Sequence, residues 1–155
     1  GTDSAGIALA LAEQKALAVS RRMPGDVVLG ADSVLALGPE RIAKCRDLTE
    51  LKAVLRKMSG KTHQLISAAA LARDGAVFWR HNDVAHLTMR CFTDGFLDAY
   101  LAADGQAVLS SVGGYHYEGR GAQLFEQVIG DSFTIQGLPL LAVMAALRQQ
   151  GILAA

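Results

Sequence analysis

The sequence predicts an α/β domain built around a mixed β-sheet, with residues 1–155 forming one domain. Two observations favour this class. Segments with the apolar spacing of helices alternate with β-type runs, and no repeat or low-complexity linker separates them. A chain of 155 residues, 51% of them hydrophobic, is also long enough to bury one sizeable core.

The first half of the chain predicts a helix, a buried strand, a short strand and a second helix. Asp3 and Ser4 are N-cap candidates for the first helix, and Asp47 followed by Glu50 has the capping-box pattern of the second. Between these helices, Pro24-Gly25 breaks the chain before the long apolar strand. The expected ranges are 7–20, 27–37, 41–44 and 48–58.

The second half predicts a hairpin, a helix, a glycine-rich loop and a final strand–helix unit. Asp74-Gly75 is a strong hairpin-turn signal, Thr93 is a helix cap, and Asp104-Gly105 is expected to end that helix. Pro139 suits the first turn of the last helix, where its missing N–H costs nothing. The expected hairpin strands are 63–73 and 76–91, the helix 94–102, the loop 112–121, a strand or short helix 124–129, a strand 133–135 and the last helix 138–149.

Composition excludes several classes of function. Fifteen basic and fifteen acidic residues cancel, so no domain-wide positive field exists to hold a nucleic acid. Apolar runs end well before the length of a membrane span, and no secretion signal opens the chain. The two cysteines have no metal-binding spacing and favour a reducing compartment. We therefore expect a cytoplasmic protein without a nucleic-acid or membrane partner.

Asp32 is the most informative residue, because it interrupts the apolar stretch "LGADSVLAL". Burying an unpaired carboxylate costs several kcal/mol, so this acid either opens into a cleft at a strand end or is held by a lysine or metal ion. Lys15 and Lys44 stand near element edges that can converge with it. An acid with two ammonium groups suits a metal-bound polyphosphate. An ordinary structural ion pair is the alternative.

The loop "SVGGYHYEGRG" adds one further acid, Glu118, among glycines that let a backbone approach a ligand closely. On its own this signal is weak. The four histidines show no metal-ligand spacing and are interpreted as structural or surface groups. Ser33 has no nucleophile-elbow context and the cysteines have no evident base, which disfavours a serine or cysteine hydrolase.

Four segments in order resemble the Maf family of nucleoside triphosphate pyrophosphatases: "LGADSVLAL", "IAKCRD", "MSGKTHQLISAAAL" and "GGYHYEGRGAQLFEQVIGDSFTIQGLPLL". The resemblance covers nearly the whole chain. It implies a Maf/ITPase-like α/β fold, with a mixed sheet split into two lobes around a central cleft. It also implies hydrolysis of a nucleoside triphosphate to the monophosphate and pyrophosphate with a divalent cation, Mg²⁺ or Mn²⁺.

The resemblance also assigns roles to individual residues. Asp32 matches the acid of the family's GAD strand, which binds the metal or activates water, and Lys44 matches the lysine of its GKP turn. Lys15 matches a substrate-binding lysine of the first helix. Glu118 falls where many members carry Gln and another subgroup carries Glu. The resemblance thus implies a catalytic set of Asp32, Lys44 and Glu118, with Asp32 also at the metal. It implies a substrate-binding set of Lys15, Lys44 and Glu118. Homodimers occur in the family.

Glu118 bears on the nucleobase. A carboxylate only accepts hydrogen bonds, and guanine presents adjacent N1–H and N2–H₂ donors that it can meet. The Glu-bearing type followed by "LFE" resembles the subgroup that acts on 7-methyl-GTP, whose cationic base suits the negative charge. The alternatives are a dTTP/UTP pyrophosphatase of the same family and a non-catalytic nucleotide-binding regulator of septum formation.

The resemblance has two departures. Family members carry an S-x-S-P-R-R loop after a first strand, and the sequence given begins beyond it, so an N-terminal strand is expected upstream. In addition, Cys45 replaces the proline of the family's turn, which predicts a looser placement of Lys44.

Overall fold

The computed structural model describes residues 3–155, which form five strands and five α-helices in that part of the chain. The strands are β1 (Val28–Leu37), β2 (Glu40–Ile42), β3 (Thr62–Arg73), β4 (Ala76–Met89) and β5 (Phe125–Ile129). The helices are α1 (Ser4–Ser20), α2 (Leu48–Met58), α3 (Asp94–Val108), α4 (Ser132–Gln136) and α5 (Leu140–Gln149), with two short 3-10 helices, η1 (Val112–Gly114) and η2 (Arg120–Leu124).

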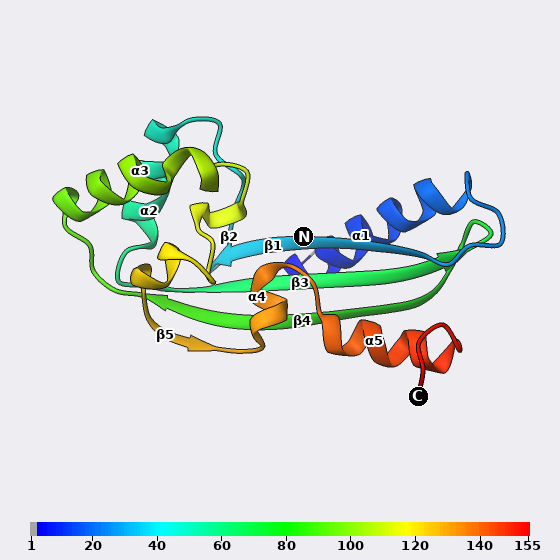
Figure 1. Cartoon of the computed structure of the whole chain (residues 1–155). Coiled ribbons are helices and arrows are strands. Elements are labelled where there is room, and N and C mark those ends of the chain that lie inside the picture. The colour runs from blue at the N-terminus through cyan, green and yellow to red at the C-terminus, as the bar shows by residue number, and fades with distance from the viewer. Residues whose placement is uncertain (1–2) are drawn as a thin grey trace. The chain divides into compact units, whose positions relative to one another are not determined.

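The strands form one sheet in the order β2-β1-β3-β4-β5. β2 pairs antiparallel with β1, β5 pairs antiparallel with β4, and Figure 1 shows β1, β3 and β4 running in alternating directions. The α/β class is confirmed, and the strand directions refine it, because neighbouring strands run antiparallel where a mixed sheet was expected. Tight turns explain much of this. At the β3–β4 turn Asp74 and Gly75 have φ of 51° and 76°, the left-handed conformation of a two-residue hairpin.

Helix starts follow the predicted capping chemistry. The side chain of Asp3 accepts a hydrogen bond from the backbone N–H of Gly6 at 2.6 Å, so α1 begins at Ser4. Asp47 accepts from the N–H of Glu50 at 2.8 Å at the start of α2. These caps satisfy backbone donors that no helical carbonyl can reach.

Three sequence-based boundaries are wrong. The segment 133–135 belongs to helix α4 and not to a strand, because Asp131 caps it through the N–H of Thr134 at 3.1 Å. Helix α3 continues past Gly105, where a Cβ would lie 2.7 Å from Cδ2 of Leu48, so this glycine gives packing room and does not end the helix. Pro139 is the N-cap of α5 and not its first helical residue.

The chain forms two compact units, each assembled from separate segments. Of the described residues, the first contains 3–33, Ile66–Val84 and Asp131–Ala155, and the second contains Val34–Leu65 and Ala85–Gly130. In the first unit the core includes a run of β3 residues from Ala68 to Ala72 that are fully buried. In the second it includes Leu51 and Leu55 of α2, which are also inaccessible to solvent. The two expected lobes match this division, whereas the single-domain organisation and the central cleft stay predictions.

Candidate active site

Lys15 of α1 and Asp32 of β1 form an ion pair in the first unit. Nζ of Lys15 lies 2.6 Å from Oδ1 of Asp32, and it also donates to the carbonyl oxygen of Ala31 at 3.3 Å. The two side chains are 57% and 20% exposed, respectively. A pair with this exposure contributes about 1 kcal/mol or less to stability. The acid inside an apolar strand is thus tolerated because an ammonium group and solvent both reach it.

A close helix–strand contact brings these two side chains together. α1 packs through a row of small residues, Ala8, Ala12 and Ala16, that are fully buried. A Cβ added to Gly30 would lie 2.3 Å from the carbonyl oxygen of Ala12 and 2.6 Å from the backbone nitrogen of Ala16. Only glycine fits there. The glycine of the "GAD" stretch therefore lets α1 approach β1 closely enough for the lysine to reach the aspartate.

Ser33, next to the aspartate, lies on the opposite face of β1, because successive side chains alternate. Its hydroxyl is 3.0 Å from that of Ser67 and 3.4 Å from the carbonyl oxygen of Gly137, which follows α4. Ser67 donates to the carbonyl oxygen of Thr134 at 2.7 Å, so Ser33 is the donor in the serine pair. This network joins β1, β3 and α4. Sequence reasoning missed it, although two serines inside apolar strands were a visible signal.

The other predicted site residues, Lys44 and Glu118, belong to the second unit. Lys44 is exposed in the irregular segment that follows β2. Glu118 is exposed on a turn in which the N–H of Gly119 donates to the carbonyl oxygen of His116 at 3.1 Å. The glycine-rich segment is therefore an ordered loop with turn structure, as expected.

A buried pair, His63 and Tyr115, supports this loop and was also missed from the sequence. Nε2 of His63 lies 2.8 Å from the hydroxyl oxygen of Tyr115, and the two residues are 1% and 5% exposed. Burial lowers the pKa of His63 from 6.5 to about 4 and raises the pKa of Tyr115. The histidine is therefore neutral at physiological pH. The interpretation of the histidines as structural or surface groups is confirmed for His63. Its partner, Tyr115, could not be identified from sequence spacing.

The chemistry of the described residues limits how a divalent cation could bind. Within residues 3–155, no group of three or more His, Cys, Asp and Glu side chains gathers to hold a metal ion. Mg²⁺, however, commonly takes only one or two protein carboxylates and completes its shell with water and substrate phosphates. The partly exposed carboxylate of Asp32 fits this role. A cation bound only by protein side chains does not fit the described part of the chain.

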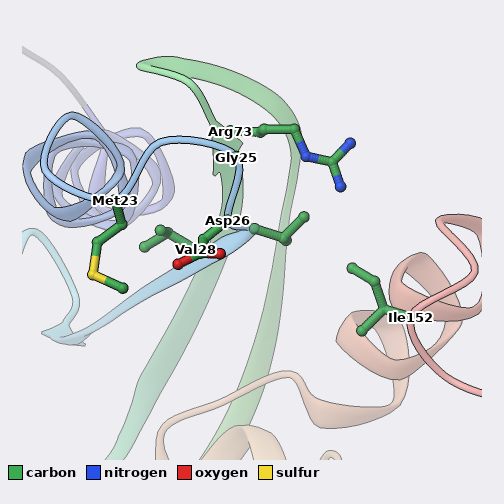
Figure 2. Close-up of a pocket in the computed structure, with 7 residues that line it drawn as sticks. Met23, Gly25, Asp26, Val28, Arg73 and Ile152 are labelled. Atoms are coloured by element: carbon green, nitrogen blue, oxygen red, sulfur yellow. The ribbon is translucent and has the colours of Figure 1, made fainter.

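An open surface hollow of about 520 Å³ also lies in the first unit, and Figure 2 shows it between the start of β1 and the residues after α5. Asp26 and Arg73 line it, but their charged groups point in different directions in Figure 2. A small-molecule site needs polar groups that converge. Asp32 is four residues along the strand from Val28 at the rim, about 13 Å away. The hollow is therefore not the candidate active site.

Cys45 and Cys91 are both free thiols. Burial, with the nearby negative charges of Glu50 and Asp47, raises the pKa of Cys45, which makes its thiolate less available. Neither the described geometry nor this pKa favours a cysteine nucleophile.

None of the helices between residues 3 and 155 has the length and apolarity required to cross a membrane.

The sequence as a whole matches a known protein family. The family model described as "Maf-like protein" matches residues 2–150. The chain belongs to the Maf family.

Individual relatives make the comparison more specific. A 7-methyl-GTP pyrophosphatase of Brucella suis biovar 1 is 51% identical over 150 residues, which cover 97% of this chain and 75% of the relative. A protein of the same name from Mesorhizobium japonicum is 50% identical over 151 residues, 97% of this chain and 76% of the relative. A nucleoside triphosphate pyrophosphatase of Rhodopseudomonas palustris is 50% identical over 153 residues, 99% of this chain and 76% of the relative.

Proposed function

We propose that this protein is a metal-dependent nucleoside triphosphate pyrophosphatase that hydrolyses a modified nucleotide, 7-methyl-GTP, to the monophosphate and pyrophosphate. The observation that carries the proposal is the Lys15–Asp32 pair, a partly exposed acid held 2.6 Å from an ammonium group. The family membership and the names of relatives at about half identity support it.

The reaction requires water to attack the α-phosphorus while pyrophosphate leaves. Asp32 accepts the proton of the attacking water, because its carboxylate is partly open to solvent and can be reached by that water. Lys15 and Lys44 donate to phosphate oxygens and compensate the charge of the leaving pyrophosphate. A bound divalent cation, Mg²⁺ or Mn²⁺, would neutralise triphosphate charge and make its bound water more acidic. Asp32 is the residue that would hold it.

Selection of the base falls to Glu118. Its carboxylate accepts hydrogen bonds from the N1–H and N2–H₂ groups of guanine, and its negative charge favours the positive charge that methylation at N7 gives the base. Uracil and thymine present an acceptor next to their single N–H donor, which a carboxylate cannot satisfy. The exposed turn that carries Glu118 leaves the carboxylate accessible to such a ligand.

A direct test measures pyrophosphate release from a panel of 7-methyl-GTP, GTP, dTTP and UTP with Mg²⁺, Mn²⁺ or a chelator. We expect the highest kcat/KM with 7-methyl-GTP and no turnover with the chelator. Lys44→Ala should lower kcat/KM about 10²-fold, on the scale of one charged transition-state contact. Lys61→Ala is the control: it removes another exposed lysine of the same unit and should leave kcat/KM unchanged.

Each alternative has its own outcome. A preference for dTTP or UTP would contradict the base assignment and leave the pyrophosphatase activity standing. Binding of nucleotides without pyrophosphate release, by a preparation that includes the natural N-terminus, would instead favour the regulator of septum formation. Homodimer formation and a cytoplasmic location belong to the same proposal, and they are tested by light scattering and by fractionation of cells.

A further inference from the structure

The loop of residues 113–121, which carries Glu118, begins directly against the core of the second unit. Gly113 and Gly114 have φ of 79° and 71°. A Cβ on Gly113 would lie 2.6 Å from Cδ1 of Leu35, and one on Gly114 would lie 2.1 Å from Cδ1 of Leu51. These distances leave no room for a side chain. The backbone entering the loop is therefore fixed against β1 and α2.

Two buried tyrosines hold the residues that follow. The hydroxyl of Tyr100 donates to the carbonyl oxygen of Gly114 at 2.9 Å. The ring of Tyr115 packs edge-on against Phe125, with ring centroids 4.9 Å apart, and its hydroxyl lies 2.8 Å from Nε2 of His63. Tyr115 is thus held at its ring and at its hydroxyl.

His63 is a costly choice for a buried position. If Tyr115 donates to Nε2, Nδ1–H of His63 has no hydrogen-bond partner among residues 3–155. The opposite direction would leave the tyrosine proton without an acceptor as well as Nδ1 unpaired, so the first is favoured. A leucine would fill this site without the unpaired Nδ1–H, but it would leave the buried Tyr115 hydroxyl without an acceptor. What the imidazole supplies and leucine cannot is a fixed acceptor for the Tyr115 hydroxyl.

The far end of the loop packs back on the same backbone. Gly119 N–H donates to the His116 carbonyl oxygen at 3.1 Å, and a Cβ on Gly121 would lie 2.4 Å from that oxygen. Glu118 lies three residues after Tyr115, inside the segment closed by these two contacts. The backbone of Glu118 is therefore held by contacts both before and after it in the loop, and its exposed side chain projects from a well-fixed turn.

We propose that His63 is a positioning residue for base selection, acting through its hydrogen bond to Tyr115 to fix the turn that presents Glu118. The inference rests on the proposed function, since it names the support of the base-reading carboxylate. His63 is 1% exposed, so it acts through Tyr115 and not by contact with the substrate. Selectivity between bases requires the carboxylate to meet two adjacent donors at once, so a small displacement of the turn loses one of them.

Loss of the positioning contact and loss of folded protein should have different effects on the kinetics of a variant. Contacts to a base that does not react act equally on ground state and transition state, so their loss raises KM and leaves kcat nearly unchanged. Destabilisation alone lowers the concentration of active enzyme and reduces turnover of every nucleotide in the same proportion. The ratio of kcat/KM for 7-methyl-GTP to kcat/KM for UTP separates the two.

The experiment compares Tyr115→Phe, His63→Leu, His63→Gln and Glu118→Ala with the wild type. Tyr115→Phe keeps the ring packing and removes only the hydroxyl, so it should fold. It should raise KM for 7-methyl-GTP about fivefold to tenfold, the effect of one hydrogen bond, and lower the ratio equally. His63→Leu should do the same, and His63→Gln should recover much of the ratio, because its amide oxygen can accept from Tyr115.

Met58→Ala is the matched control for core damage. Met58 is fully buried and lies on α2 seven residues from Leu51, about 10 Å along the helix from the loop contact. It should lower stability and leave the ratio unchanged.

The outcomes separate this inference from the function on which it rests. The inference is overturned if Tyr115→Phe and His63→Leu keep the wild-type ratio while Glu118→Ala loses it. If Glu118→Ala also keeps the ratio, base selection by Glu118 is wrong and the inference falls with it, but the pyrophosphatase activity stands. If the wild type releases pyrophosphate from no nucleotide, the proposed function itself fails, and the inference with it.

Discussion

The two regions that carry the predicted chemistry are built in different ways. In the first unit, Lys15 and Asp32 stand on a regular helix and a regular strand, and one glycine contact sets their separation. In the second unit, Glu118 stands on a loop whose shape depends on buried side chains from several segments, above all His63 and Tyr115. The first region places its charges through one contact between two neighbouring elements, and the second does so through contacts among several distant segments.

This difference has an energetic consequence. The Lys15–Asp32 pair is partly exposed, so its removal should change stability little while it removes the proposed proton acceptor and phosphate-binding lysine. The His63–Tyr115 pair is buried, so its removal changes stability and, through the loop, selectivity. Stability and turnover should therefore separate at the exposed ion pair of the first region, whereas stability and selectivity should be coupled at the buried pair of the second.

The largest effect is expected at Asp32. Asp32→Asn removes the proton acceptor and the candidate metal ligand, so kcat for 7-methyl-GTP should fall about 10³-fold. Its unfolding free energy should change by less than about 1 kcal/mol, because the lost ion pair is partly exposed. Pyrophosphate release and urea unfolding measure the two quantities. A kcat within tenfold of the wild type, in a folded variant, would contradict the role given to this residue.

The helix–strand contact should be the most sensitive point of the first region for stability. Gly30→Ala places a methyl group 2.3 Å from the Ala12 carbonyl oxygen, and overpacking of this kind costs about 2–3 kcal/mol. We expect kcat to fall as α1 moves and carries Lys15 away from Asp32, with the base ratio unchanged. Chemical denaturation and kinetics test both statements.

Gly95→Ala is the matched control. A Cβ at Gly95 meets nothing within 4 Å, and the residue lies in α3. The substitution should stabilise the protein by about 0.5–1 kcal/mol, because alanine favours helix and restricts the unfolded chain. If both variants lost equal stability, the Gly30 contact would have no special role.

Sequence reasoning predicted the polar pair of the first region, but it missed the buried pair that supports the loop of the second. Asp32 could be identified because an acid in an apolar strand demands a partner, and Lys15 is that partner in the structure. The capped helices α1 and α2 were predicted for equally local reasons.

What the sequence could not provide depends on contacts between distant segments. His63 and Tyr115 are 52 residues apart, and no periodicity links them. Gly105 resembles a helix stop until its contact with Leu48 is known. The same limit applies to 133–135, where a five-residue helix is set by the Asp131 cap and not by apolar spacing. The roles of Asp32, Lys15, Lys44 and Glu118 all stay predictions.

Acid should weaken the second region through His63. Because the pKa of His63 is lowered from 6.5 to about 4, the unfolded chain binds more protons than the folded protein between these values. The contribution of neutral His63 to the free energy of unfolding is present above pH 6.5, and it is lost as the pH falls toward 4. Between pH 7 and pH 5 the loss should be about 2 kcal/mol.

The control for this acid effect is His63→Gln, which cannot titrate in the same range. Denaturant unfolding at pH 7 and pH 5 should show a difference of about 2 kcal/mol between wild type and variant in their dependence on pH. Equal dependence would show that the imidazole is solvated in the folded state. Other titrating groups cancel in the comparison, because both proteins contain them.

The smallest effect expected concerns the two tyrosines that hold adjacent residues of the loop. Tyr100→Phe leaves the Gly114 carbonyl without its 2.9 Å donor and should cost about 1 kcal/mol, as should Tyr115→Phe. Because both hydroxyls fix the same backbone, their losses should not add, and the double variant should show a coupling of about 0.5 kcal/mol or more. Urea unfolding of the four proteins of this cycle measures it. Additivity within about 0.3 kcal/mol would mean that each tyrosine supports the loop separately, and the second region would then be as modular as the first.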